Sequence, residues 1–280
     1  MRLPNFGYHV ARWRGNLVRR FYRAFLPFIV RQRIRPARSV AIEVFAYSGE
    51  DSLPEQVASI RSFLRHVGRP MSFTIVSDGS HESNSLRWLR SVDPCVAVRE
   101  PVTARADLPD RVQRYLNEHP TGKQLALIMD LPHSGPALYI DSDVLFFSGG
   151  ADLITQFSVQ NTSALYQRDC QFSGDRRLLR GAAEELLPVN TGFLLIFRKL
   201  DWSKGIARFL ELEGAPNFFT NQTMTHLVMH DNQAEPFDPA KYVLQLDDQF
   251  IFPDRYAGPN LALRHYVNPV RHKFWTSLSQ

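Results

Sequence analysis

Two aspartates, separated by one residue, interrupt an apolar run near the middle of the chain. The run is Ala137-Leu138-Tyr139-Ile140-Asp141-Ser142-Asp143-Val144-Leu145-Phe146-Phe147. Burying two unpaired carboxylates is costly, and a divalent cation held by both removes that cost. Hard oxygen ligands suit Mg²⁺ or Mn²⁺, and the oxygens of a diphosphate can fill the remaining positions. The pattern predicts a cation and diphosphate site at Asp141, Ser142 and Asp143, against the alternative of a solvated acidic turn.

The surrounding pattern places this pair at the end of a strand. Residues 137–140 are expected to form a buried strand, and α/β proteins build their sites at the carboxyl ends of strands. The other strands are expected over 40–47, 71–76, 95–98 and 192–197. The helices between and after them are expected over 52–67, 82–92, 111–118, 122–131, 202–212 and 220–229. Strands that alternate with helices predict an α/β fold with a mostly parallel sheet flanked by helices.

A phosphatase of the haloacid dehalogenase type also has two aspartates at this spacing after a strand. Its pattern continues with Gly-Thr or Gly-Val and follows the first strand. Here Val144-Leu145 follows, in the middle of the chain. This alternative is therefore disfavoured.

Four separated motifs resemble the GT-A nucleotide-sugar transferases, especially retaining glycosyltransferase family 8. They span residues 137–275, and their order follows the family pattern. They are Tyr139-Ile140-Asp141-Ser142-Asp143, Val189-Asn190-Thr191-Gly192 with its hydrophobic continuation, Asn221-Gln222-Thr223 where the family has Asp-Gln-Asp, and His265-Tyr266-Val267-Asn268-Pro269-Val270-Arg271-His272-Lys273-Phe274-Trp275. The resemblance implies a GT-A fold, which is Rossmann-like and binds nucleotide-diphosphate sugars.

The resemblance also implies roles for residues far apart in the sequence. Asp141, Asp143 and His265 would hold Mn²⁺ or Mg²⁺. Residues implied to contact the donor's diphosphate are Arg271, Lys273 and Lys123; the alternatives are a solvated basic tail and an exposed helix lysine. Asn190 is implied to line the sugar or acceptor side, against the alternative of a turn before a strand, and Gln222 is implied to orient the sugar. Tyr47 can stack on a base, against the alternative of a core aromatic, and Asp78 can meet the base or ribose.

The chain departs from the family pattern at three places. Asn221 replaces an aspartate, Asn268 replaces a glycine, and the first strand ends in Ala46-Tyr47-Ser48 without an aspartate. The expected activity is metal-dependent transfer of a hexose from a UDP-sugar to a saccharide or glycolipid acceptor, as in cell-envelope polysaccharide synthesis. Retention is favoured; an inverting enzyme would need a base such as Asp247 or Asp248. The alternatives are a nucleotidyltransferase on a related fold and a non-catalytic protein that binds nucleotide-sugars at a membrane surface.

Residues 1–38 differ in charge from the rest of the chain. They contain ten arginines and no acid, so removing them changes the net charge from +5 to −5. Leu17, Phe21 and Phe25 recur at helical spacing among these arginines. The segment 1–38 is expected to be a basic amphipathic arm that either lies on an anionic membrane or packs on the domain 39–280. Arginines interrupt every window long enough to span a bilayer, there is no basic stripe elsewhere for nucleic acid, and two cysteines make no disulfide framework. The expected location is cytoplasmic, and peripheral on the inner face of the membrane where the arm binds it.

Overall fold

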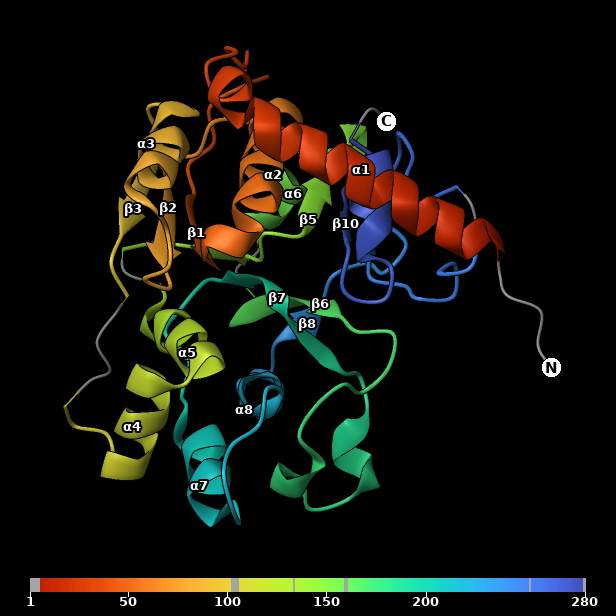
Figure 1. The fold of residues 1–280 in the computed structure, drawn as a ribbon. Coiled ribbons are helices and arrows are strands. Elements are labelled where there is room, and N and C mark those ends of the chain that lie inside the picture. The colour runs from red at the N-terminus through yellow and green to blue at the C-terminus, as the bar shows by residue number, and fades with distance from the viewer. Residues whose placement is uncertain (1–5, 102–105, 133, 159–160, 252, 279–280) are drawn as a thin grey trace.

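A seven-stranded sheet forms the centre of the molecule (Figure 1). The computed structural model describes residues 6–101, 106–132, 134–158, 161–251 and 253–278. The strand order is β3-β2-β1-β4-β7-β6-β8. The strands are β1 (Glu43–Ser48), β2 (Ser72–Ser77), β3 (Val96–Arg99), β4 (Ala137–Ile140), β6 (Ala164–Arg168), β7 (Val189–Ile196) and β8 (Glu235–Pro236). Only β7 runs antiparallel to its neighbours, β4 and β6. The prediction of a mostly parallel α/β sheet is confirmed.

Helices cover both faces of this sheet, because side chains alternate between the faces along each strand. Leu138 and Ile140 belong to one hydrophobic core, and Ala137 and Tyr139 to the other. The first core is covered by α2 (Leu53–His66) and α3 (Ser83–Ser91), with α6 (Asp152–Gln156) beside them. The second is covered by α4 (Asp110–Glu118), α5 (Pro120–Asp130), α7 (Ser203–Glu211) and α8 (Thr220–Asp231). Figure 1 shows these two groups above and below the strands.

A second, three-stranded sheet was not predicted from the sequence. It contains β5 (Val144–Phe146), β10 (Leu263–His265) and β9 (Tyr242–Val243), with β10 in the middle. Strands of two or three residues give no clear alternation in the sequence. This small sheet joins the residues after the acidic pair to the C-terminal segment, because β5 and β10 are antiparallel partners.

A buried cluster of charges holds the C-terminal segment. Arg264 is fully buried and binds both Asp248 and Asp254. Lys273 donates to Asp248 at 3.0 Å and to the carbonyls of Ile251 and Pro253. This cluster fixes the segment that continues into the 3₁₀ helix η5, residues 271–276.

The predicted N-terminal arm forms a long helix, α1 (Phe6–Ile29), which crosses α2 and the C-terminal segment (Figure 1). Leu26 lies in the first core, Arg19 pairs with Glu55 at 2.5 Å, and Gly15 lies against the backbone of His272. The division into an arm 1–38 and a domain 39–280 stays a prediction. Among the residues described, none of the helices combines the length and apolar character needed to cross a bilayer.

Candidate metal and diphosphate site

The acidic pair occupies the short connection between β4 and β5. Two backbone hydrogen bonds hold this connection from either side. The amide of Asp141 donates to the carbonyl of Gly192 at 2.8 Å, and the amide of Tyr266 donates to the carbonyl of Asp143 at 2.9 Å. The pair is thus fixed between strand β7 and the chain that follows β10.

His265 completes a three-residue cluster with the pair. The register of β5 with β10 places His265 opposite Val144, next to the acidic pair. Its Nε2 lies 3.0 Å from Oδ1 of Asp143 and 3.9 Å from Oδ2 of Asp141. One ligand atom from each of the three residues lies within 4.8 Å of the others. The structure therefore brings together the three residues that the resemblance implied as metal ligands.

The charges of these three groups depend on one another. Burial raises the pKa of Asp141, and the neighbouring carboxylate of Asp143 adds to that effect. Burial also opposes ionisation of Asp143, but His265 and Arg271 outweigh it and lower the Asp143 pKa to about 2. For His265, the attraction of Asp143 overcomes burial and raises the imidazole pKa above its ordinary value. A negative charge on Asp143 and a positive charge on His265 therefore stabilise each other.

The donor set fits a divalent cation. Two carboxylates and one imidazole are ligands that Mn²⁺ accepts, and binding would displace the Nε2 proton of His265. The Oε1 of Gln167 lies 3.1 Å from Nδ1 of His265, where it can accept the remaining imidazole proton. Such a second partner fixes the tautomer that leaves Nε2 free for a metal. The fold and this acidic cluster are consistent with a divalent metal site.

Gly192 leaves the space that the cluster occupies. A Cβ on this residue would lie 2.2 Å from Cε1 of His265 and 2.7 Å from Oδ2 of Asp141. The close approach of these side chains to strand β7 therefore requires glycine here.

A hydrogen-bond chain supports the far side of Asp141. Its Oδ1 accepts from the hydroxyl of Tyr139 at 2.8 Å and from the amide of Gln124 at 3.0 Å. Asn221 in turn donates to Oε1 of Gln124 at 2.9 Å. The residue that departs from the family pattern at position 221 thus supports Asp141 indirectly. Gln124 was missed in the sequence, although it adjoins the candidate Lys123.

Of the three basic candidates, only Arg271 contacts the acidic pair. Its guanidinium lies 2.9 Å from Asp143, and 42% of its side chain is exposed. A cavity of about 450 Å³ opens beside it, lined also by Asn268 and by Arg12 and Arg19 of α1. Lys273 is instead buried in the charge cluster around Asp248.

Lys123 lies half-buried on α5. In the part of the chain that the structure describes, its ammonium makes no ion pair within 4.0 Å. Its role toward a donor stays a prediction.

The two sugar-side candidates meet a carboxylate that the sequence analysis missed. Asp169 is 5% exposed and directly follows β6. Asn190 and Gln222 donate to it at 3.4 and 3.3 Å. The signal that selected the acidic pair, a polar residue directly after a strand, did not select Asp169, because strand β6 was not predicted from the sequence. Ser142 is buried between the two aspartates.

The two nucleotide candidates end neighbouring parallel strands, Tyr47 within β1 and Asp78 just after β2. Burial and the nearby Asp78 raise the pKa of Tyr47 to about 12. The Tyr47 hydroxyl is buried and has no hydrogen-bond partner among the described residues. Asp78 accepts from the amide and hydroxyl of Ser80. A nucleotide role for either residue stays a prediction.

Solved structures of several glycosyltransferases have folds similar to that of this chain. Neither a protein-family model nor a curated protein sequence matches this chain. The bifunctional glycosyltransferase WbbM is similar over 89% of this chain and 50% of its own, with 13% identity and a TM-score of 0.56. The galactosyltransferase LgtC, in complex with donor and acceptor sugar analogues, is similar over 85% of this chain and 95% of its own, with 13% identity and a TM-score of 0.53.

Mouse xyloside xylosyltransferase 1 is similar over 83% of this chain and 99% of its own, with 10% identity and a TM-score of 0.52. This chain spans half the length of WbbM. The similarity to these structures shows that this chain has the GT-A glycosyltransferase fold, with an acidic cluster near the end of β4.

Proposed function

We propose that the chain is a metal-dependent glycosyltransferase that moves a hexose from a UDP-sugar to a saccharide or lipid-linked acceptor. The observation that carries this proposal is the meeting of Asp141, Asp143 and His265 with Arg271 at the end of β4. A cation site beside a half-exposed guanidinium suits a diphosphate, because the cation and the guanidinium can together offset its negative charge. The fold of the similar glycosyltransferases supports the same conclusion.

The reaction breaks the bond between the anomeric carbon and the diphosphate oxygen, and negative charge then builds on the leaving diphosphate. Stabilising that charge is the main task of the protein. When bound, the cation would act there as a Lewis acid. Arg271 would hold the diphosphate with its fork of donors, after releasing part of its contact with Asp143. Asp141 and Asp143 would be fixed by the backbone bonds to β7 and to Tyr266.

The resemblance to family 8 favours a retaining reaction. Gln222 and Asn190 would orient the sugar, with Asp169 fixing their amides. Of the two acids considered as a base, Asp248 is fully buried and bound to Arg264 and Lys273. It is therefore unsuited to accept a proton from an acceptor hydroxyl. In a retaining reaction of the family 8 kind, the leaving phosphate itself would accept that proton.

Nucleotide release from a panel of UDP-sugars with Mn²⁺ tests the proposal. Wild type is expected to release UDP from at least one donor, and Asp143→Asn is expected to lose most of that activity. Glu118→Gln is the matched control, because it removes an exposed carboxylate on α4, away from the cluster. Equal activity of wild type and Asp143→Asn would overturn the metal assignment. UDP binding without turnover of any donor would favour the non-catalytic alternative.

The proposal includes an anionic membrane as a partner, which residues 1–38 would contact and which would carry the acceptor. The arginines and the absence of acids in residues 1–38 support this partner. A lipid-linked acceptor, as used in envelope polysaccharide synthesis, would then reach the site from a membrane on which α1 lies.

A further inference from the structure

Helix α1 has two apolar faces. One face packs on the domain through Ala11, Gly15 and Leu26. The other is exposed and runs the length of the helix. We call it the α1 stripe: Phe6, Val10, Trp13, Leu17, Phe21, Phe25 and Phe28, each at least 36% exposed. A row of large exposed apolar residues, most of them aromatic, beside basic residues is typical of helices that lie in a membrane interface.

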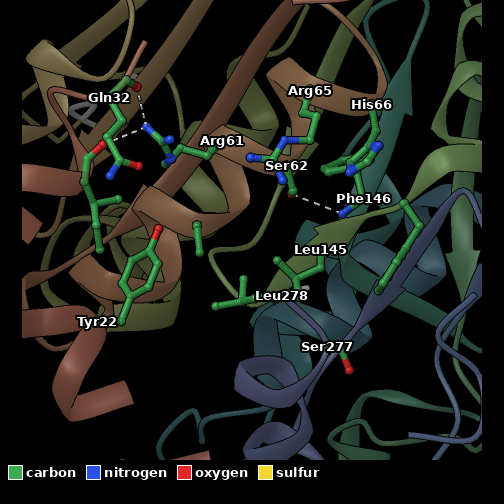
Figure 2. Close-up of a pocket in the computed structure, with 13 residues that line it drawn as sticks. Tyr22, Gln32, Arg61, Ser62, Arg65, His66, Leu145, Phe146, Ser277 and Leu278 are labelled. Carbon is green, nitrogen blue, oxygen red and sulfur yellow. Dashed lines mark hydrogen bonds between the residues drawn. The ribbon is translucent and has the colours of Figure 1, made fainter. Parts of the chain in front are cut away.

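A cavity of about 210 Å³ lies beside this helix, between α1, α2, β5 and the C-terminal segment (Figure 2). Tyr22 and Ile29 line it from α1. Phe25, in the α1 stripe, precedes Ile29 by four residues and therefore lies one turn away along nearly the same side of the helix. The cavity thus adjoins the stripe. A ligand bound in the cavity can therefore extend toward the surface of the α1 stripe.

The cavity is basic and contains no acid among its lining residues. Arg61, Arg65 and His66 come from α2, and Figure 2 shows Arg65 and His66 side by side at one end. Arg61 is fixed by donating to the carbonyls of Ile29 and Gln32 at 2.8 and 3.0 Å. Arg65 has no acidic partner within 4.0 Å among the described residues. Apolar side chains from β5 and the C-terminus form the opposite wall, among them Leu145 and Leu278.

The charge of Arg65 disfavours the positive charge of its two basic neighbours, Arg61 and His66. Burial lowers the pKa of Arg61; Tyr22 opposes this effect and the charge of Arg65 adds to it. Burial and Arg65 lower the pKa of His66 in the same way. An anion in the cavity would relieve this repulsion. The volume exceeds that of several waters at about 30 Å³ each, so a phosphate group fits with some of its hydration.

We propose that this cavity binds the phosphate of an anionic phospholipid while the α1 stripe lies in the membrane interface. The basic groups recognise the phosphate, and the apolar wall and the stripe accept the start of the acyl chains. The inference rests on the proposed membrane contact of residues 1–38. It does not depend on glycosyl transfer.

Titration calorimetry with a short-chain, water-soluble phosphatidylglycerol below its micelle concentration tests the site. Wild type is expected to bind, and Arg65→Gln is expected to bind about fivefold more weakly or worse. Arg20→Gln is the matched control, because it removes an exposed charge from α1 outside the cavity. Equal binding by Arg65→Gln and wild type would overturn the cavity assignment.

Two further arms separate the possible sources of phosphate and the two proposals. Inorganic phosphate is titrated at matched ionic strength, and binding as tight as that of the lipid would replace the lipid assignment with free phosphate. Sedimentation with vesicles of phosphatidylcholine, with and without phosphatidylglycerol, compares wild type with Trp13→Ser in the stripe. Failure of wild type to bind the anionic vesicles would overturn the membrane contact. UDP release without vesicles is expected to be unchanged in Arg65→Gln, so a failure of the catalytic proposal would be seen separately.

Discussion

Replacing Gly192 with alanine is expected to disable the metal site while leaving the fold in place. Gly192 lies within β7, and its backbone is not in the left-handed region. Alanine can therefore adopt its backbone conformation. The added methyl group is the whole perturbation, and it points at His265 and Asp141.

The size of the effect follows from the distances. The new Cβ would lie 2.2 Å from Cε1 of His265, and ordinary contact begins at 3.4 Å, so the ring must move by about 1.2 Å. Overpacking of this kind costs about 1–3 kcal/mol of stability. This displacement is about half the length of a metal–nitrogen bond, and a nitrogen moved that far no longer coordinates the metal well. Because loss of even an outer-shell partner weakens metal binding about 10–100-fold, we expect at least about 100-fold weaker Mn²⁺ binding.

Mn²⁺ titration followed by electron paramagnetic resonance, with and without UDP, measures this affinity directly. Gly181→Ala is the control, because a Cβ at that exposed position meets nothing within 4 Å. Circular dichroism checks that each variant is folded. A folded Gly192→Ala protein with unchanged Mn²⁺ affinity would refute the assignment of His265 and Asp141 as ligands.

Three further predictions concern stability. Arg264→Leu leaves the buried Asp248 without its main partner and is expected to lower the free energy of unfolding by about 3–5 kcal/mol in urea titrations. Burial lowers the pKa of His226 to about 4, below its ordinary value of 6.5, so the unfolded chain binds the proton first. Stability is therefore expected to fall as the pH drops from about 6.5 toward 4, by up to about 3 kcal/mol, and this loss is expected to shrink in His226→Gln. Gly15→Ala would force α1 away from the backbone of His272 and is expected to lower the melting temperature despite the better helix propensity of alanine.

Each of these predictions has an outcome that contradicts it. A urea midpoint for Arg264→Leu equal to that of wild type would mean that the buried charges are held by other groups. An acid-stability profile unchanged by His226→Gln would assign the loss to other groups. A Gly15→Ala protein as stable as wild type would show that α1 is not closely packed on the C-terminal segment.

The sequence determined the elements with strong local patterns. Helix α2 lies within the predicted range 52–67; Pro54 falls in its first turn and Gly68 follows its end with a positive φ, while Ser52 precedes it without a side-chain cap hydrogen bond. The four-residue strand β4 was predicted at its exact bounds, because four apolar residues lead directly into two acids. Asp141 and Asp143 could be selected because their spacing is local.

The tertiary structure decided which distant residues meet this pair. His265 reaches Asp143 only through the pairing of β5 with β10, and strands of three residues leave no periodicity to read. The same limit explains the basic tail: nothing in the sequence distinguishes Arg271, which contacts Asp143, from Lys273, which the buried Asp248 holds. The charges and the spacing of apolar residues along the chain are enough to show that residues 1–38 are basic and amphipathic. Only packing decided that α1 buries one apolar face on the domain and leaves the other exposed, because that choice depends on surfaces supplied by residues far along the chain.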